Sequence, residues 1–293
     1  MNSEEKQAAV LLAIKQMTPM SASAAAILQK ISGEHELADI VHIVKHDPAM
    51  TLRVLRVVNS AAYYGRQAPV LSIERAVSML GESLIVGIAI SEAASHVFAR
   101  PLNGYAAEAG ALWRHDLRCA IAAKKIAAFT AGQVGSDLAF TSGLLHDMGK
   151  AVTSDFLKNT AGTIQAALDQ HRVKDYAAAE KVLVGMDHGE VGQALALAWN
   201  LPEPIPTVLR FHHHPSEAPP EWQPLVYVVH LGDILAMMAG CGTGSDTLQY
   251  ALDGGYVNYI TLEKDALALV VLEVEEEFVR TVASLTGEEG GAA

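Results

Sequence analysis

Hydrophobic residues recur along the first third of the chain at helical spacing, in short segments with clear breaks. Those of residues 37–44 stand at i, i+3, i+4 and i+7, which is one face of a helix. Asp47-Pro48 ends this helix, because the residue before a proline is pushed out of the α region. The segments follow no fixed repeat, so we expect an irregular helical bundle rather than a solenoid. The other helices predicted here lie within 1–16, 52–58 and 73–80.

Longer helical segments follow a cluster of Pro, Asn and Gly at 100–104, which is typical of a domain boundary. No stretch alternates for long in the manner of a strand. We predict an all-α fold in which an N-terminal irregular helical bundle, 1–104, packs against a C-terminal helical bundle, 105–286. A glycine-rich loop is expected at 240–244 and a frayed tail at 287–293. The C-terminal helices are predicted at 105–130, 137–158, 160–171, 174–184, 188–199, 203–213, 223–239 and 262–286.

Composition and charge exclude several classes of protein. The chain is 51% hydrophobic and 18% charged, so it buries enough apolar surface to fold and disorder is excluded. Its longest apolar runs, at 84–90 and 266–272, are far shorter than the ~20 residues that span a bilayer, so no membrane association is expected. A polar N-terminus without a secretory signal and only two cysteines predict a cytoplasmic protein. With a net charge of −12, no direct nucleic-acid binding is expected.

Two polar residues stand on predicted helices that are otherwise apolar. Asp233 lies within 226–238, and an ionised carboxylate without a partner is strongly disfavoured in an apolar interior. Either an arginine or a bound cation would satisfy it. His115 shares a helical stripe with Leu112 and Cys119. Taken alone, His115 is better explained as a core histidine with ordinary hydrogen-bond partners.

Further inward-facing histidines follow along the chain. His146-Asp147 is flanked by glycines, which would permit a close approach of neighbouring groups, although a lone His-Asp pair is a weak signal. Asp187 and Glu190 form a predicted capping box, which places His188 between them in the first turn of a helix, facing inward. His212 shares a face with apolar residues of 205–209, and His213 is its neighbour. Each residue alone favours an ordinary structural role.

Together these side chains predict a metal centre. Five imidazoles and two carboxylates on successive helices suit one or two divalent transition-metal ions, with Fe or Mn favoured and Zn also suitable. Asp147 could bridge two ions, and dispersed ligands without cysteine favour a site with open positions. Lys150 would add a cation for a phosphoryl oxygen, or would be a solvated lysine at a helix end. The predicted ligands are His115, His146, Asp147, His188, His212, His213 and Asp233.

At this point the sequence resembles a known family. The segment Leu144-Leu-His-Asp-Met-Gly-Lys150 is similar to the central motif of the HD superfamily of metal-dependent phosphohydrolases. Further motifs resemble the HDOD family of bacterial signalling domains, and the likeness covers roughly residues 17–280. It implies an N-terminal bundle packed against an HD-like C-terminal bundle. These motifs lie at 47–52, 57–63, 76–81, 185–192 and 199–202.

The resemblance implies a regulatory output module, and many HDOD domains have lost the HD metal ligands. This sequence keeps them: the seven residues fill the ligand order of binuclear HD proteins, including the HD-GYP cyclic di-GMP phosphodiesterases, and resemble the set of HD-type di-iron oxygenases. Two departures from HD-GYP proteins stand out. No Gly-Tyr-Pro motif follows the paired histidines, and Ala111 stands where some trinuclear members carry a carboxylate.

Three functions follow as hypotheses. The first is a metal-containing signalling module whose partner is a signalling protein or a nucleotide second messenger. The second is a phosphohydrolase acting on a cyclic nucleotide or cyclic di-GMP, with Asp147 and Lys150 in catalytic roles. The third is a di-iron oxidase or redox sensor. Regulation is placed slightly ahead of hydrolysis, because the family is regulatory while the intact ligand set favours chemistry.

Overall fold

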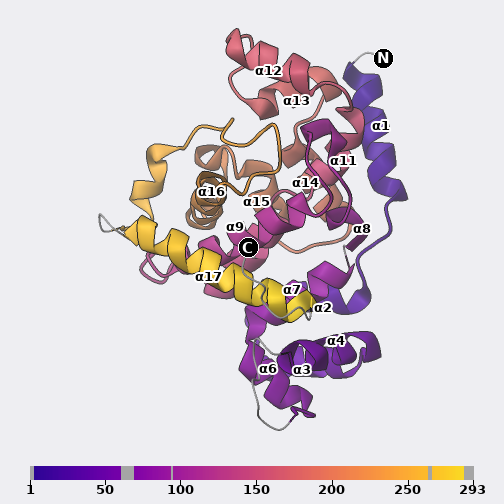
Figure 1. Cartoon of the computed structure of the whole chain (residues 1–293), viewed down its shortest axis with the longest axis vertical. Coiled ribbons are helices and arrows are strands. Elements are labelled where there is room, and N and C mark those ends of the chain that lie inside the picture. The colour runs from indigo at the N-terminus through magenta and orange to yellow at the C-terminus, as the bar shows by residue number, and fades with distance from the viewer. Residues whose placement is uncertain (1–2, 61–68, 94, 263–265, 287–293) are drawn as a thin grey trace.

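The chain folds into helices joined by loops, as the computed structural model in Figure 1 shows. The structure describes residues 3–60, 69–93, 95–262 and 266–286, and within these ranges it contains no β-strand, which confirms the all-α prediction. Short 3₁₀ turns occur at Asn103–Tyr105, Pro215–Glu217 and Gly254–Asn258. The α-helices are α1 (Ser3–Gln16), α2 (Ala22–Ile31), α3 (Leu37–Lys45), α4 (Pro48–Val58), α6 (Ile73–Leu80), α7 (Glu82–Ala93), α8 (Ser95–Phe98), α9 (Ala111–Ala127), α10 (Ser136–Leu145), α11 (Lys150–Phe156), α12 (Ala161–Asp169), α13 (Tyr176–Val184), α14 (His188–Ala198), α15 (Ile205–Phe211), α16 (Gln223–Met238) and α17 (Ala266–Thr286).

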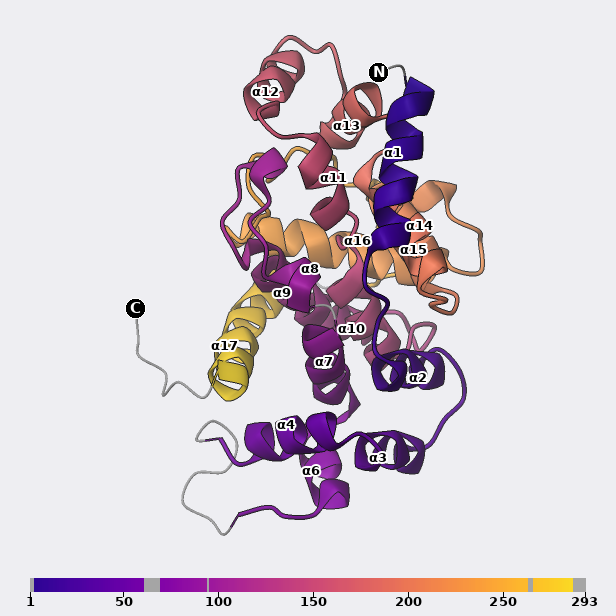
Figure 2. The same cartoon turned by 90° about the vertical axis from the view of Figure 1, so that its right-hand side faces the viewer.

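Helices α3, α4 and α6 form a small group at one end of the molecule, and α7 joins it to the rest (Figure 2). The predicted break between the first two of these helices is confirmed. Asp47 caps α4 by accepting a hydrogen bond from the Met50 N–H, and Pro48 occupies the first helical position, where no N–H is needed. Part of the 57–63 motif, residues 61–63, lies outside the described residues.

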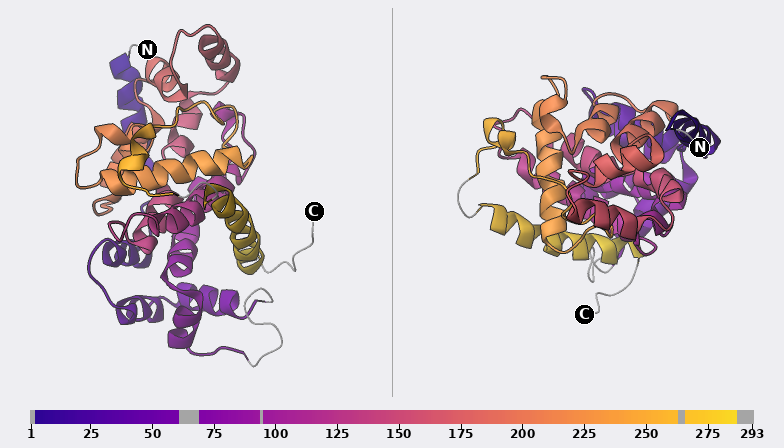
Figure 3. Two further views of the ribbon diagram at one scale, coloured as in Figure 1. Left: turned by 90° about the vertical axis from the view of Figure 1, so that its left-hand side faces the viewer. Right: turned by 90° about the horizontal axis from the view of Figure 1, so that it is seen from above.

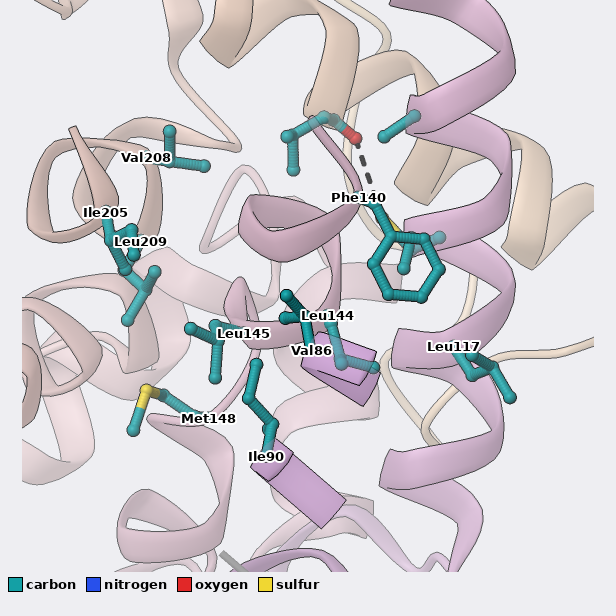
Figure 4. Packing of buried hydrophobic residues seen from close by; sticks show 14 of the residues in the cluster. Val86, Ile90, Leu117, Phe140, Leu144, Leu145, Met148, Ile205, Val208 and Leu209 are labelled. Carbon is teal, nitrogen blue, oxygen red and sulfur yellow. Dashed lines mark hydrogen bonds between the residues drawn. The ribbon is translucent and has the colours of Figure 1, made fainter. Parts of the chain in front are cut away.

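Helix α9 is the centre of the C-terminal group, with α10 and α16 packed closely along it. Small residues permit the close approach: a Cβ on Gly143 of α10 would lie 2.8 Å from the Ala120 Cα, and one on Gly232 of α16 would lie 3.1 Å from the Cys119 carbonyl oxygen. The hydrophobic core runs from α7 through α10 to α15, as the side chains of Ile90, Phe140 and Leu209 illustrate (Figure 4). Helix α17 lies across α9 on the outside (Figure 3).

The first helix packs with the C-terminal group and away from α3, α4 and α6. Helix α1 contacts α11, α13 and α14, and its Lys6 ammonium donates a hydrogen bond of 2.6 Å to the Leu183 carbonyl. Val10 and Ile14 are its buried residues. The predicted division at residue 104 stays a prediction, but α1 is held by helices on the other side of it.

Helix boundaries differ from the prediction in two segments that carry predicted metal ligands. The predicted helix over 137–158 is wrong, because the chain makes a tight turn at 146–149 that separates α10 from α11. The predicted helix over 105–130 begins only at Ala111, after the 3₁₀ turn at Asn103–Tyr105. The expected loop at 240–244 is non-helical, and the tail at 287–293 lies outside the described residues. No helix in the described ranges is both long and apolar enough to cross a bilayer.

Candidate metal centre

His115 and Asp233 are brought together by the packing of α9 against α16. His115 is 1% exposed, and its Nδ1 lies 2.6 Å from the Cys241 carbonyl oxygen, to which only an N–H can donate. The opposite nitrogen, Nε2, lies 3.0 Å from Asp233 Oδ1. Gly232 lets the two helices approach at this level. Among the described residues, the polar side chain nearest to the buried Asp233 is therefore the His115 imidazole and not an arginine.

The turn between α10 and α11 turns His146 and Asp147 toward the same point. Successive turn bonds, including Lys150 N–H to the Asp147 carbonyl at 2.9 Å, replace the helical pattern. Gly149 is required there, because a Cβ would lie 2.0 Å from the His188 carbonyl oxygen. His146 Nδ1 lies 2.8 Å from the Gly143 carbonyl oxygen, so its Nε2 faces the centre. A continuous helix would separate the two side chains by about 100°.

His188 is the first residue of α14, and the predicted capping box of Asp187 and Glu190 is confirmed. The His188 ring is held by a further residue, Glu180, which the sequence did not lead us to predict. Glu180 of α13 is fully buried, and its Oε2 accepts hydrogen bonds from the His188 backbone N–H at 2.7 Å and from Nδ1 at 2.8 Å. Its other oxygen accepts from the Tyr105 hydroxyl at 2.7 Å. A carboxylate behind a histidine is the usual orienting partner of a metal ligand.

His212 and His213 follow directly after α15. The Nδ1 of His212 lies 2.8 Å from the Leu209 carbonyl oxygen, which leaves Nε2 for the centre. His213 stacks on the ring of Tyr250, with centroids 3.7 Å apart and an interplanar angle of 12°. Its Nδ1 lies 3.7 Å from Asp233 Oδ2, and its Nε2 lies 3.0 Å from His188 Nε2.

Asp147 lies in the middle, with its two oxygens facing different histidines. Oδ1 lies 3.5 Å from His188 Nε2 and 3.4 Å from His212 Nε2. Oδ2 lies 3.6 Å from His146 Nε2 and 3.7 Å from His115 Nε2. The structure thus brings all seven predicted residues together, in two groups that share one carboxylate.

The donor atoms at this point lack ordinary partners. Because the Nδ1 atoms of four histidines are engaged by a carbonyl or by Glu180, their Nε2 atoms are the ones that face the centre and can serve as metal ligands. Buried polar atoms without partners are costly, and a cation would satisfy several of them at once. The residues therefore fit divalent transition-metal ions. The buried atoms without a hydrogen-bond partner here are His115 Nε2, His146 Nε2, Asp147 Oδ1, His213 Nδ1 and Asp233 Oδ2, whereas Asp147 Oδ2 pairs with the Lys150 ammonium.

Lys150 is buried, so the alternative of a solvated lysine at a helix end is wrong. It is 1% exposed, and its ammonium lies 2.5 Å from Asp147 Oδ2, 2.5 Å from Asp246 Oδ2 and 2.8 Å from Thr243 Oγ1. Burial alone would lower the pKa of Lys150, but the two carboxylates outweigh it and raise that pKa. Since the three N–H donors are engaged, Lys150 holds Asp147 in place in this conformation.

Burial and charge shift the other pKa values in opposite directions. Burial would raise the pKa of Asp147, but Lys150 and the neighbouring histidines hold it well below its usual range. Burial would lower the pKa of His188, but Glu180 raises it to about 9. At His212 burial prevails and lowers the pKa to about 4. The centre therefore mixes anionic carboxylates with histidines of contrasting basicity.

The sequence reading also missed Asp116, the neighbour of His115 on α9. It is fully buried, neither of its oxygens has a hydrogen-bond partner, and Oδ1 lies 3.8 Å from His146 Nδ1. Burial and the Asp147 charge raise its pKa well above the usual range. Its position in an otherwise apolar helical stripe was the available signal.

The chain between α16 and α17 folds over the centre. We call residues 239–253 the cover loop. Its Asp246 accepts hydrogen bonds from Thr243 and from the Tyr250 hydroxyl, and pairs with Lys150. Beneath it, the side chains of the seven predicted residues are 7% exposed or less. The centre is thus closed to any molecule of nucleotide size in this conformation.

Comparison with known proteins identifies a family. The HDOD domain model matches residues 17–215. A curated relative, an uncharacterized protein of Treponema pallidum (strain Nichols), is 29% identical over 194 residues, which make up 66% of this chain. The chain spans 37% of the length of that relative.

Solved structures share the fold. An HDOD domain protein of unknown function from Geobacter sulfurreducens has a TM-score of 0.69 at 21% identity, over 98% of this chain and 97% of its own. A proposed signal transduction protein from Marinobacter aquaeolei has a TM-score of 0.73 at 19% identity, over 97% of this chain and 65% of its own. A proposed phosphohydrolase from Shewanella amazonensis has a TM-score of 0.66 at 23% identity, over 95% and 98%.

Proposed function

Because the chain belongs to the HDOD family, we propose that it is a regulatory signal-transduction module that retains a binuclear metal centre. The observation that carries this proposal is the arrangement around Asp147, whose two oxygens face two different groups of histidines. Fe or Mn suits these nitrogen and oxygen donors best, and Zn also fits. The proposed ligands are His115, His146, Asp147, His188, His212, His213 and Asp233.

The cover loop favours regulation over hydrolysis. A hydrolytic centre must admit its substrate, whereas here Tyr250 stacks on His213 and Lys150 is paired with Asp246. A closed centre suits a module that passes a signal to a signalling protein or responds to a nucleotide second messenger. The protein would be cytoplasmic in this role.

The intact ligand set supports a second candidate, a metal-dependent phosphodiesterase acting on a cyclic nucleotide or cyclic di-GMP. Bound divalent ions would supply Lewis-acid activation of a phosphoryl oxygen and of water. Asp147 would hold the two metal positions at a fixed separation, and Lys150 would orient Asp147. Opening of the cover loop would release Lys150 from Asp246 and admit the substrate. A di-iron oxidase or redox sensor is a third use of the same ligands.

Metal analysis tests the proposed centre. Protein purified without chelator or metal-affinity resin should contain two transition-metal ions per chain by elemental analysis. Asp147→Asn should lower this below one, because both groups lose their shared ligand. His42→Gln, a change to a histidine of α3 far from the centre, should leave it unchanged. A metal content near zero in the wild type, with the fold intact, would end the proposal of a metal centre.

Activity separates the candidate functions. A phosphodiesterase should turn over bis(p-nitrophenyl) phosphate or cyclic di-GMP with Mn or Fe, and Asp147→Asn should abolish this. A regulatory module should show metal at full occupancy without such turnover. A di-iron redox centre should change its optical spectrum on reduction and reoxidation. Rapid turnover by the wild type would place hydrolysis ahead of regulation.

A further inference from the structure

A cavity of about 370 Å³ lies between the start of α9 and the cover loop. Helix α9 contributes Arg114, His115 and Arg118, and the loop contributes Gly240–Gly242 and Gly244. Its volume falls within the range of small-molecule sites, roughly 300–1,000 Å³. We call it the His115 cavity, because His115 lines it and is also a proposed metal ligand.

The wall of the His115 cavity carries the guanidinium groups of Arg114 and Arg118 together with the carboxylate of Glu108. Arg118 is fixed, since it is bonded to Glu275 through two nitrogens and lies over the Phe278 ring. Arg114 can exchange its partner for another anion, because the side chain of that partner, Glu108, is 80% exposed. Exposed pairs of this kind contribute little, about 0.2–1 kcal/mol, so an anion in the cavity can displace Glu108.

The cover loop adds backbone donors. Cys241 N–H donates to the Ala236 carbonyl, and Ser245 N–H to the Tyr105 carbonyl. Between them, the N–H groups of Gly242 and Gly244, two residues that line the cavity, donate to no acceptor within the described part of the chain. Free backbone N–H groups that line a cavity can donate hydrogen bonds to an anion. They would supplement the guanidinium of Arg114 with donors for the several oxygens of a phosphate.

We propose that the His115 cavity binds the phosphate group of a small molecule, and that occupancy acts on the metal centre through His115. The cavity has room for a phosphate together with an attached organic group. This inference rests on the proposed function for its regulatory meaning, but the binding step itself requires no metal.

A single hydrogen bond connects the cavity to the centre. The Cys241 carbonyl, on the loop that lines the cavity, accepts from His115 Nδ1 at 2.6 Å. This bond directs His115 Nε2 toward Asp233 Oδ1, 3.0 Å away. A ligand that draws residues 242–244 toward Arg114 shifts this carbonyl and reorients the His115 ring. Binding outside the centre is thereby coupled to one of its ligands.

Calorimetry on the metal-free 293-residue chain tests binding without competition from metal-bound phosphate. The probes are inorganic phosphate and adenosine monophosphate, with adenosine as the phosphate-free control. At least one phosphate probe should bind, and Arg114→Gln should weaken it at least tenfold. Arg56→Gln, the same change at an exposed arginine of α4, should alter affinity less than twofold. Ala111→Leu, which fills the cavity without a change of charge, should weaken binding as well.

The arms of this experiment distinguish the sources of the phosphate. Tighter binding of the nucleotide identifies a phosphate monoester, and equal binding of both identifies free phosphate as sufficient. The proposal would be overturned if neither probe bound at millimolar concentration. It would also be overturned if Arg114→Gln bound the probe with the same affinity as the wild type. If no phosphate binding were found but the protein contained two metal ions per chain, the proposed metal centre would still be supported.

Coupling is read from the His115 imidazole in the same metal-free protein. Its ¹⁵N resonances, assigned by comparison with His115→Gln, should shift on saturation with the bound probe in wild type and in Arg56→Gln. A ligand that binds with an unmoved His115 signal would refute the coupling.

Discussion

At the residue scale, the centre is governed by how each buried charge is compensated. Lys150, Asp147 and Asp246 form a buried chain of alternating charge, and Glu180 balances His188. Breaking such an arrangement at one member leaves an uncompensated charge in a region of low dielectric. The free energy of unfolding is therefore sensitive to replacement of any one of these charged side chains by an uncharged one, even in the absence of a metal.

Lys150→Met tests this compensation. We expect the metal-free protein to lose about 3–5 kcal/mol of unfolding free energy, because Asp147 and Asp246 lose their shared cation. The double variant Lys150→Met with Asp246→Asn should recover part of the loss, since one of the stranded charges is removed. Urea unfolding measures both. A single variant as stable as the wild type would show that the ammonium is not needed to balance the two carboxylates.

Two histidines are among the groups of the centre through which the stability of the metal-free protein should depend on pH. The pKa of His188 is raised from 6.5 to about 9, because Glu180 outweighs the effect of burial. Its contribution, about 3 kcal/mol, is complete below pH 6.5 and is lost as the pH rises through 9. Burial lowers the pKa of His212 to about 4, so stability also falls as the pH drops from 6.5 toward 4. Urea unfolding of chelator-treated protein should therefore show a maximum near pH 6.5.

Glu180→Gln provides the control for this profile. Removing the carboxylate should abolish most of the loss of stability above pH 6.5. The loss of stability below pH 6.5 should remain. If both proteins lost equal stability between pH 6.5 and 9, His188 would not be the titrating group.

At the element scale, the decisive feature is the turn between α10 and α11. It brings His146 and Asp147 to one point and sets α11 directly against the start of α14. The contact depends on Gly149, since a Cβ there would lie 2.0 Å from the His188 carbonyl oxygen and 2.6 Å from the Gly192 nitrogen. The glycine that the motif contains is therefore a packing requirement of the centre.

Gly149→Ala should force α11 and α14 apart. We expect a loss of about 2–3 kcal/mol and a lower metal content, because His188 moves with α14. Gly162→Ala on α12 is the matched control, since no atom lies within 4 Å of its added Cβ. That change should be neutral or stabilising by up to about 1 kcal/mol. Thermal unfolding and elemental analysis of both variants provide the measurement, and equal behaviour would contradict the close contact.

At the scale of the whole molecule, α1 secures the helices that carry the centre. It packs on α11, α13 and α14, which hold Lys150, Glu180 and His188. The N-terminal sequence therefore belongs to the same cooperative unit as the predicted metal ligands, although about a hundred residues or more separate them along the chain.

Ile14→Ala tests this role of α1. Ile14 is 4% exposed, so its truncation should cost about 2–4 kcal/mol and reduce hydrogen-exchange protection in α11 and α14. Leu12→Ala, at a position 57% exposed on the same helix, should change stability by less than about 0.5 kcal/mol. Loss of protection confined to α3, α4 and α6 would contradict this view.

The sequence by itself determined the helical class, most helix positions and the identity of the seven convergent side chains. Periodicity and capping are local properties, and a buried Asp233 signals a need for a partner wherever it lies in the fold. Only the tertiary structure decided that α10 ends at Leu145, that Lys150 is buried between two carboxylates and that Glu180 and Asp116 stand behind the histidines. These features depend on contacts between segments distant in sequence, and hydrophobic spacing carries no information about such contacts.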